Sequence, residues 1–162
     1  MALREISLTL PNRPGTLGGV ARILAKERIN VAAIGVDSAA AKGRVRLIVS
    51  DPDRAERLLA DAGYEVEVRE MIAVRLEDRA GSFLRVLDAL SREKVNIQSV
   101  AILVAREGNQ PVVALSTNDL PRTRKLLQRA GFTPSGGEPV VSNDELLASA
   151  PSVPSESVGL LL

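Results

Sequence analysis

The 162-residue sequence predicts an α+β protein built from two copies of one βαββαβ unit, each with an antiparallel sheet that carries its helices on one face. Three observations predict this class. Alternating apolar residues, typical of strands buried on one face, are interleaved with apolar residues at the spacing of amphipathic helices. The whole order of segments occurs twice. In addition, the motif "NRPGTL" at residues 12–17 returns as "DRAGSF" at residues 78–83.

The first strand and the first helix of the two copies align at an offset of 66 residues. The alternating strand residues Ile6, Leu8 and Leu10 fall on Ile72, Val74 and Leu76. The helical stripe of Leu17, Val20, Ala21 and Leu24 falls on Phe83, Val86, Leu87 and Leu90. An amphipathic helix is therefore predicted after each Gly-containing turn.

The second half of each copy aligns at an offset of 68 residues. A third strand is predicted over residues 45–49 and 113–117, and a second helix ends at "AGY" (62–64) and at "AGF" (130–132). The two extra residues fall where "REGNQP" replaces the shorter "AAKG", at a hairpin tip, where insertions are tolerated. This many ordered matches with one insertion in a loop indicates an internal duplication.

Polar and glycine residues mark the helix ends. Asp51 and Asp119 stand where an N-cap would begin the second helix of each copy, and Pro52 follows the first of them at N1. Gly63 and Gly131 are predicted at the C′ positions of the same helices. The first helices are expected to end near residues 28 and 94, just before the "INV" and "VNI" strands.

The order strand, helix, strand, strand, helix, strand in about 70 residues is that of the ferredoxin-like fold. We therefore expect unit one at residues 1–70, unit two at residues 71–141, and a partly flexible C-terminal tail at residues 142–162, which is rich in Pro and Ser. The segment 64–76, "YEVEVREMIAVRL", contains no Gly or Pro. The last strand of unit one is thus expected to run almost directly into the first strand of unit two.

Composition excludes several classes of function. Lys and Arg number 21 against 20 Asp and Glu, so no basic footprint for nucleic acid is present. Tyr64, Phe83 and Phe132 lie outside the first and third strands, where an RNA-binding sheet of this topology needs its aromatic residues. Cys and His are absent, which removes thiolate and imidazole chemistry and the commonest metal ligands. No catalytic residue, metal or cofactor is predicted, because phosphate-binding Gly-rich motifs are absent as well.

Localisation follows from the N-terminus and from hydropathy. The segment "MALREISL" has charges among its first five residues and no apolar core of a signal peptide. No run of 18 apolar residues occurs, so no membrane span is expected. We expect a cytoplasmic protein.

The repeated motif resembles that of the ACT domain, a small-molecule-sensing module of enzymes in amino-acid metabolism. The resemblance rests on an apolar strand, then N/D-R-P/A-G-T/S-L/F at the start of a helix, then N-V/I about 15 residues after the Gly. It covers residues 3–141 approximately. It implies a non-catalytic regulatory protein that binds an amino acid or a related small ligand at an interface between paired ACT units. A homodimer and a metabolic enzyme as partner are further expectations.

The resemblance also implies the ligand-binding residues. The turn residues carried over are Asn12, Arg13, Pro14, Gly15 and Thr16, and Asp78, Arg79, Ala80, Gly81 and Ser82. The second-strand residues are Asn30, Val31, Asn96 and Ile97. The ligand would lie between the Gly turn of one unit and the second strand of the facing unit.

Physical chemistry supports these roles but leaves alternatives open. A Gly permits close approach of a ligand, free N–H groups at a helix start favour a carboxylate, and an Asn side chain offers a donor and an acceptor. The glycines could equally close a tight turn, Thr16 and Ser82 could be N-caps, the asparagines could end a helix, and the arginines could be solvated. An alternative function is a structural or regulatory subunit that pairs with a metabolic enzyme and binds no ligand itself.

Overall fold

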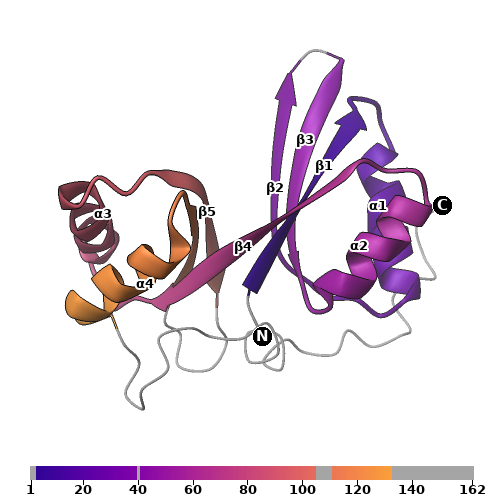
Figure 1. Ribbon diagram of the computed structural model, residues 1–162. Helices are drawn as coiled ribbons and strands as arrows, with labels where there is room; N and C mark the ends of the chain where they lie inside the picture. The colour runs from indigo at the N-terminus through magenta and orange to yellow at the C-terminus, as the bar shows by residue number, and fades with distance from the viewer. Residues whose placement is uncertain (1–2, 40, 105–110, 133–162) are drawn as a thin grey trace.

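A computed structural model describes residues 3–39, 41–104 and 111–132 (Figure 1). Within these ranges, six strands and four helices follow one another in the predicted order. Unit one contains β1 (Leu3–Pro11), α1 (Thr16–Lys26), β2 (Val31–Ala39), β3 (Lys42–Val49), α2 (Pro52–Asp61) and the first half of β4 (Val66–Arg75). Unit two contains the second half of β4, α3 (Ser82–Arg92), β5 (Ile97–Val104), β6 (Pro111–Thr117) and α4 (Leu120–Arg129).

The strands form one sheet in the order β2-β3-β1-β4-β6-β5, and every neighbouring pair is antiparallel. β4 joins the units, as the uninterrupted segment 64–76 predicted. Its residues 66–71 pair with β1, and its residues 72–75 pair with β6. The α+β class, the tandem ferredoxin-like units and the antiparallel pairing are confirmed.

Each unit has its own core between the sheet and two helices. In unit one, Val20 and Leu24 of α1 and Leu59 of α2 pack on the strand residues that the alternation predicted. In unit two, Val86 and Leu90 of α3 do the same. In Figure 1 the two helix pairs lie on opposite outer sides of the molecule with the strands between them. Each half of the sheet therefore carries helices on one face only, as expected.

The faces of the sheet without helices pack against each other. Leu3 of β1 and Ile48 of β3 form one cluster with Met71 and Ala73 of the shared strand β4 and with Leu103, Val112 and Ala114 of unit two. Ala33 of β2 and Ala101 of β5 pack against this cluster from the two edge strands. We call the surface between these two faces the inner side of the sheet. The continuous sheet thus folds over along β4, and the helices stay outside.

The predicted helix ends are confirmed. The Asp51 carboxylate accepts a hydrogen bond of 3.1 Å from the N–H of Arg54, and Asp119 caps α4 in the same way over 3.0 Å. Gly63 and Gly131 follow α2 and α4 with φ of 87° and 81°, the left-handed conformation of a C′ glycine. A residue in that conformation also follows the C-caps of α1 and α3, but it is not a glycine: residues 28 and 94 each have φ of 57°.

Some predictions lie outside the described residues. These are the last strand of unit two, the longer hairpin tip between β5 and β6, and the C-terminal tail at 142–162.

Candidate functional site

The two predicted Gly turns connect β1 to α1 and β4 to α3. Gly15 and Gly81 have φ of 86° and 88°, which L-residues with a Cβ adopt rarely. No atom lies within 4 Å of a Cβ built on either glycine. The glycines are therefore required by backbone conformation, and the space beside them is open.

The turns leave the starts of α1 and α3 without a side-chain cap. Gly15 and Gly81 occupy the N-cap positions, so the alternative of Thr16 and Ser82 as N-caps is wrong. The Thr16 hydroxyl instead donates back to the Arg13 carbonyl over 2.9 Å. By contrast, α2 and α4 are capped by aspartates. The first N–H groups of a helix have no partner inside it, so α1 and α3 present the N-termini suited to an anion.

The predicted asparagines precede the edge strands. The Asn30 N–H donates to the Ser50 hydroxyl over 3.0 Å, and its carbonyl accepts from the Ser50 N–H at the same distance. Asn96 is bound to Asn118 in the same arrangement. The backbones of the two asparagines thus fix the start of β2 and β5, and their side chains are exposed.

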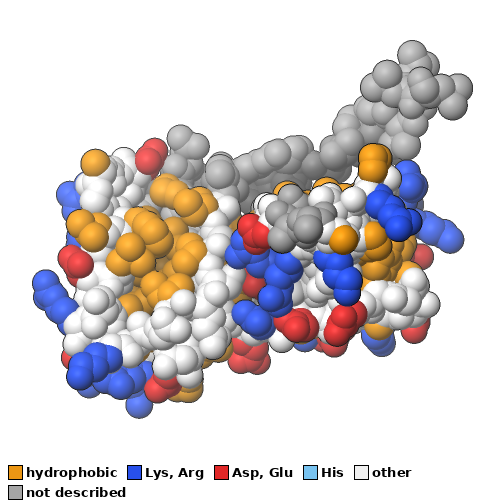
Figure 2. Space-filling model, turned by 90° about the horizontal axis from the view of Figure 1, so that it is seen from above, with side chains coloured by type: hydrophobic (Ala, Val, Ile, Leu, Met, Phe, Trp, Pro, Cys, Tyr) orange, Lys and Arg blue, Asp and Glu red, His pale blue; other side chains and the backbone are white. Residues whose placement is uncertain are grey.

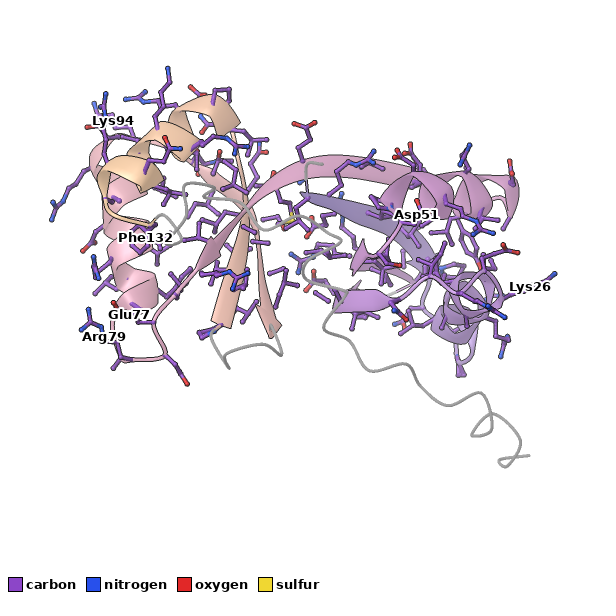
Figure 3. The ribbon with its side chains drawn as sticks, turned by 90° about the horizontal axis from the view of Figure 1, so that it is seen from below. Lys26, Asp51, Glu77, Arg79, Lys94 and Phe132 are labelled. Atoms are coloured by element: carbon purple, nitrogen blue, oxygen red, sulfur yellow. The ribbon has the colours of Figure 1, made fainter. Side chains whose placement is uncertain are left out.

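The turn and the asparagine of one unit lie at opposite ends of that unit. An eleven-residue helix separates them, which corresponds to about 16 Å. Figure 3 shows this for unit two, where the labelled Arg79 beside the turn and Lys94 beside the start of β5 lie at opposite ends of α3. Val31 and Ile97 begin β2 and β5 directly after the asparagines.

The remaining turn residues are exposed, and the two turns differ. Asn12, Arg13 and Pro14 of the first turn and Asp78, Arg79 and Ala80 of the second are all exposed. Arg79 forms an ion pair of 2.6 Å with Glu77. Ser82 is buried, and its Oγ has no hydrogen-bond partner. The second turn is therefore more acidic than the first, and its helix begins with a buried hydroxyl.

Apolar side chains are exposed along the edge strands and at the start of the uncapped helices. In unit one they are Leu17, Val31, Ile34 and Val36, and in unit two they are Leu84 and Ile102. Figure 2 shows hydrophobic side chains gathered on one face of the unit that carries α3 and α4. β2 and β5 are the two edges of the sheet, and no ladder joins them in the described structure. Such apolar edges are typical of protein interfaces.

A cavity of about 340 Å³ lies on the inner side of the sheet, between the two units. β1 and β3 contribute Glu5, Arg46 and Ile48, β2 contributes Ala33, Ile34 and Gly35, and β5 contributes Val100, Ala101 and Ile102. None of the predicted site residues lines it. A second cavity of about 480 Å³ lies between the end of α3 and the start of β5, and Asn96 and Ile97 are among its lining residues.

Glu5 and Arg46 were not predicted as site residues because they lie on the polar phase of their strands, which alternation assigns to solvent. Ser99 was not predicted because it is a single small polar residue on an otherwise apolar phase of β5. A signal was nevertheless present. Leu3 and Ile48 are apolar on the polar phase of β1 and β3. Apolar residues on both faces of a strand indicate that both faces are buried.

Among the residues that the structure describes, no group of acidic side chains could hold a metal ion, and no helix is long and apolar enough to cross a membrane.

The chain is similar to one known protein family and to several proteins of known structure. A family model described as an ACT domain pair matches residues 1–132. A protein from Bacteroides thetaiotaomicron of known crystal structure is 27% identical, with a TM-score of 0.78, over 90% of this chain and 96% of that chain. The ligand-free regulatory subunit of aspartate kinase from Thermus thermophilus is 17% identical, with a TM-score of 0.58, over 80% and 92% of the two chains. Aspartate kinase from Clostridium acetobutylicum is 15% identical, with a TM-score of 0.51, over 80% of this chain and 33% of that enzyme. A search of curated proteins found no match.

Proposed function

Because this chain belongs to the family of ACT domain pairs, we propose that it is a cytoplasmic, non-catalytic regulatory module that binds a small carboxylate-bearing ligand, most simply an amino acid. One observation carries the proposal. The two helices that follow the repeated motif start at exposed left-handed glycines without a side-chain cap, whereas the other two helices are capped by aspartate. The ligand carboxylate would take the place of the missing cap.

A second copy of the chain would complete the site. β1 and β2 are both antiparallel to β3, so they run in the same direction, and the Gly15 turn lies at the sheet end opposite to Asn30. A partner's β2 that pairs antiparallel with β2 would bring the side chain of Asn30 of the partner copy, which precedes that strand, to this Gly turn. The same relation holds for β5 and the Gly81 turn. The exposed Ile34 and Val36 on the edge strand favour such a homodimer.

The ligand test uses thermal shift and calorimetry with the twenty amino acids and related carboxylates. A ligand at 100 times its dissociation constant should stabilise the protein by about 2.7 kcal/mol. Gly15→Asn and Gly81→Asn are the informative variants, because Asn tolerates the left-handed conformation and places a side chain in the open space. Gly63→Asn, at a left-handed glycine that follows α2 and belongs to neither motif, is the matched control.

We expect the turn variants to weaken binding at least tenfold, and Asn30→Ala or Asn96→Ala to weaken it by about 1–3 kcal/mol. The control should bind as the parent does. Folded turn and asparagine variants of both units that keep parental affinity would place the ligand elsewhere.

The dimer is tested separately by light scattering. The chain has a mass of 17.2 kDa, so a dimer is expected at twice that value. Val36→Glu places a charge in the proposed interface and should shift the protein toward the monomer, while Ala60→Glu on the exposed side of α2 should not. A monomer at all concentrations would overturn the dimer and leave the fold unaffected.

The exposed apolar edges also favour a second candidate function, a subunit that docks on a metabolic enzyme without binding a ligand. The two functions separate in the ligand screen. If no amino acid or related carboxylate stabilises the parent protein, the docking function is the better account.

A further inference from the structure

The inner cavity contains a buried carboxylate that lacks one hydrogen-bond partner. Glu5 is only 2% exposed. Its Oε2 accepts a hydrogen bond of 2.8 Å from the Ser99 hydroxyl, but its Oε1 is buried without a partner. Buried polar atoms are nearly always hydrogen-bonded, because an unpaired one keeps its full desolvation cost. Oε1 therefore marks a place where a donor is missing.

The same cavity contains a guanidinium with a missing acceptor. One terminal nitrogen of Arg46 is paired with Asp37 over 2.9 Å, but the Nε is buried without a partner. The guanidinium lies over Gly35, where a Cβ would stand 3.4 Å from it. Gly35 thus provides the room in which this side chain lies along the wall of the cavity.

Glu5 and Arg46 do not satisfy each other. They are diagonal neighbours on β1 and β3, since Glu5 faces Ile48 and Arg46 faces Ser7. Such diagonal positions place the Cβ atoms about 7–8 Å apart. No ion pair joins the two side chains. The cavity therefore offers an acceptor on one side and a cationic donor on the other, which complements a molecule that carries both an ammonium and a carboxylate.

The other walls of the cavity determine which side chain the bound molecule can carry between its two charged groups and the wall. These walls are aliphatic, and small residues at 33, 35 and 101 leave the space open. A volume of about 340 Å³ is at the lower end for ligand pockets. These aliphatic walls offer no hydrogen-bond partner to a further charged group on the ligand. The walls accordingly favour a small aliphatic body.

The repeat shows that this arrangement belongs to one unit only. At the offsets of the repeat, unit two has Met71 where unit one has Glu5, and Ala114 where unit one has Arg46. The Gly turns occur twice per chain, but this pair of charges occurs once. The inner cavity is thus separate from the two turns.

We propose that the inner cavity is a second ligand site, which binds one small aliphatic zwitterion per chain between the two units. Glu5 Oε1 accepts from the ammonium, and Arg46 Nε donates to the carboxylate. Since residues of both units line the cavity, bound ligand ties the units together. This site does not depend on the Gly turns or on a second copy of the chain.

The probes are L-valine, L-alanine and L-leucine, together with two analogues of valine, 2-hydroxyisovalerate without the ammonium and isobutylamine without the carboxylate. In a Gly15→Asn, Gly81→Asn double variant, which blocks the proposed turn sites, calorimetry should give one site per chain. We expect Glu5→Gln to weaken L-valine binding at least tenfold and to leave the affinity for 2-hydroxyisovalerate unchanged. Arg46→Gln should weaken L-valine at least tenfold and leave isobutylamine unchanged. This crossed pattern assigns each charge to its partner.

Three further variants complete the test. Ala101→Leu fills the cavity without touching either charge and should abolish binding, so it decides the matter if Glu5→Gln fails to fold. Arg44→Gln is the matched control, because Arg44 lies on the same strand and face but pairs with Glu67 outside the cavity. Gly15→Asn should leave this binding intact even if it abolishes binding at the turns. The proposal is overturned if none of the three amino acids binds, or if Ala101→Leu binds them as the parent does.

Discussion

The hydroxyl of Ser99 in unit two donates a hydrogen bond of 2.8 Å to Oε2 of Glu5 in unit one, and both side chains are buried. The two residues are 94 positions apart in the chain. Around them the inner faces of the sheet meet, so this bond is a polar contact inside a mostly apolar interface. Removing this hydrogen bond would leave a buried carboxylate oxygen without a partner, and that cost sets the contribution of the bond to stability.

Ser99→Ala should lower the free energy of unfolding by about 1–3 kcal/mol, because it leaves the Glu5 carboxylate without its donor. Adding Glu5→Met, the residue at the corresponding position of unit two, should recover part of that loss by removing the buried acceptor as well. Urea denaturation at neutral pH measures both. Ser91→Ala, on the exposed side of α3, is the control. A Ser99→Ala protein as stable as this control would show that the hydrogen bond contributes nothing.

Leu103→Ala should lower the free energy of unfolding by about 2–5 kcal/mol, because Leu103 is 2% exposed and packs in the cluster between the units. Both units share β4, so thermal unfolding of the parent should occur in one transition. Leu84→Ala removes the same atoms from an exposed side chain of α3 and should change stability by less than about 0.5 kcal/mol. Two separate transitions in calorimetry would contradict a cooperative interface.

Gly15→Ala should cost about 1–2 kcal/mol, the price of a left-handed conformation for an L-residue. No atom lies near the added Cβ, so the cost comes from the backbone alone. Gly15→Asn should cost less, since Asn adopts this conformation more readily. Chemical denaturation of the two variants side by side gives the comparison. Equal losses in both variants would point to a clash with side-chain volume instead.

Acid should weaken the contact between β1 and α2. The hydrogen bond from Arg4, followed by the charge of the same guanidinium, holds the pKa of Asp53 below its usual range, across an ion pair of 2.7 Å. Because this pKa is lower in the folded state, the stabilisation is present above the unfolded pKa near 4 and disappears as the pH falls through the folded value.

The stability difference between the parent and Asp53→Asn should therefore shrink from pH 7 to pH 2, as followed by thermal unfolding across that range. Asp61→Asn removes a carboxylate without an ion pair at the other end of α2 and serves as the control. A difference for Asp53→Asn that stays constant with pH would rule out this linkage.

Local signals determined much of the structure. The alternation in residues 6–10 and 72–76, the helical stripes after each Gly turn, and the aspartate caps predicted the elements and their ends. These features depend on neighbours within a few residues, and the duplication presented each of them twice. Even the continuity of β4 could be predicted, because the segment 64–76 lacks a residue that would break a strand.

Only the tertiary structure decided what the inner side of the sheet does. Alternation assigns Glu5 and Arg46 to a polar face, but it does not say whether that face meets water or another sheet. The fold along β4 brings Ser99 to Glu5 from the far end of the chain and buries both. Burial of this kind depends on contacts between residues distant in sequence. The alternation of residues within one strand does not show whether such contacts form. The Gly turns were visible in the sequence because backbone conformation selects glycine locally, whereas the inner cavity exists only because two faces of one sheet meet.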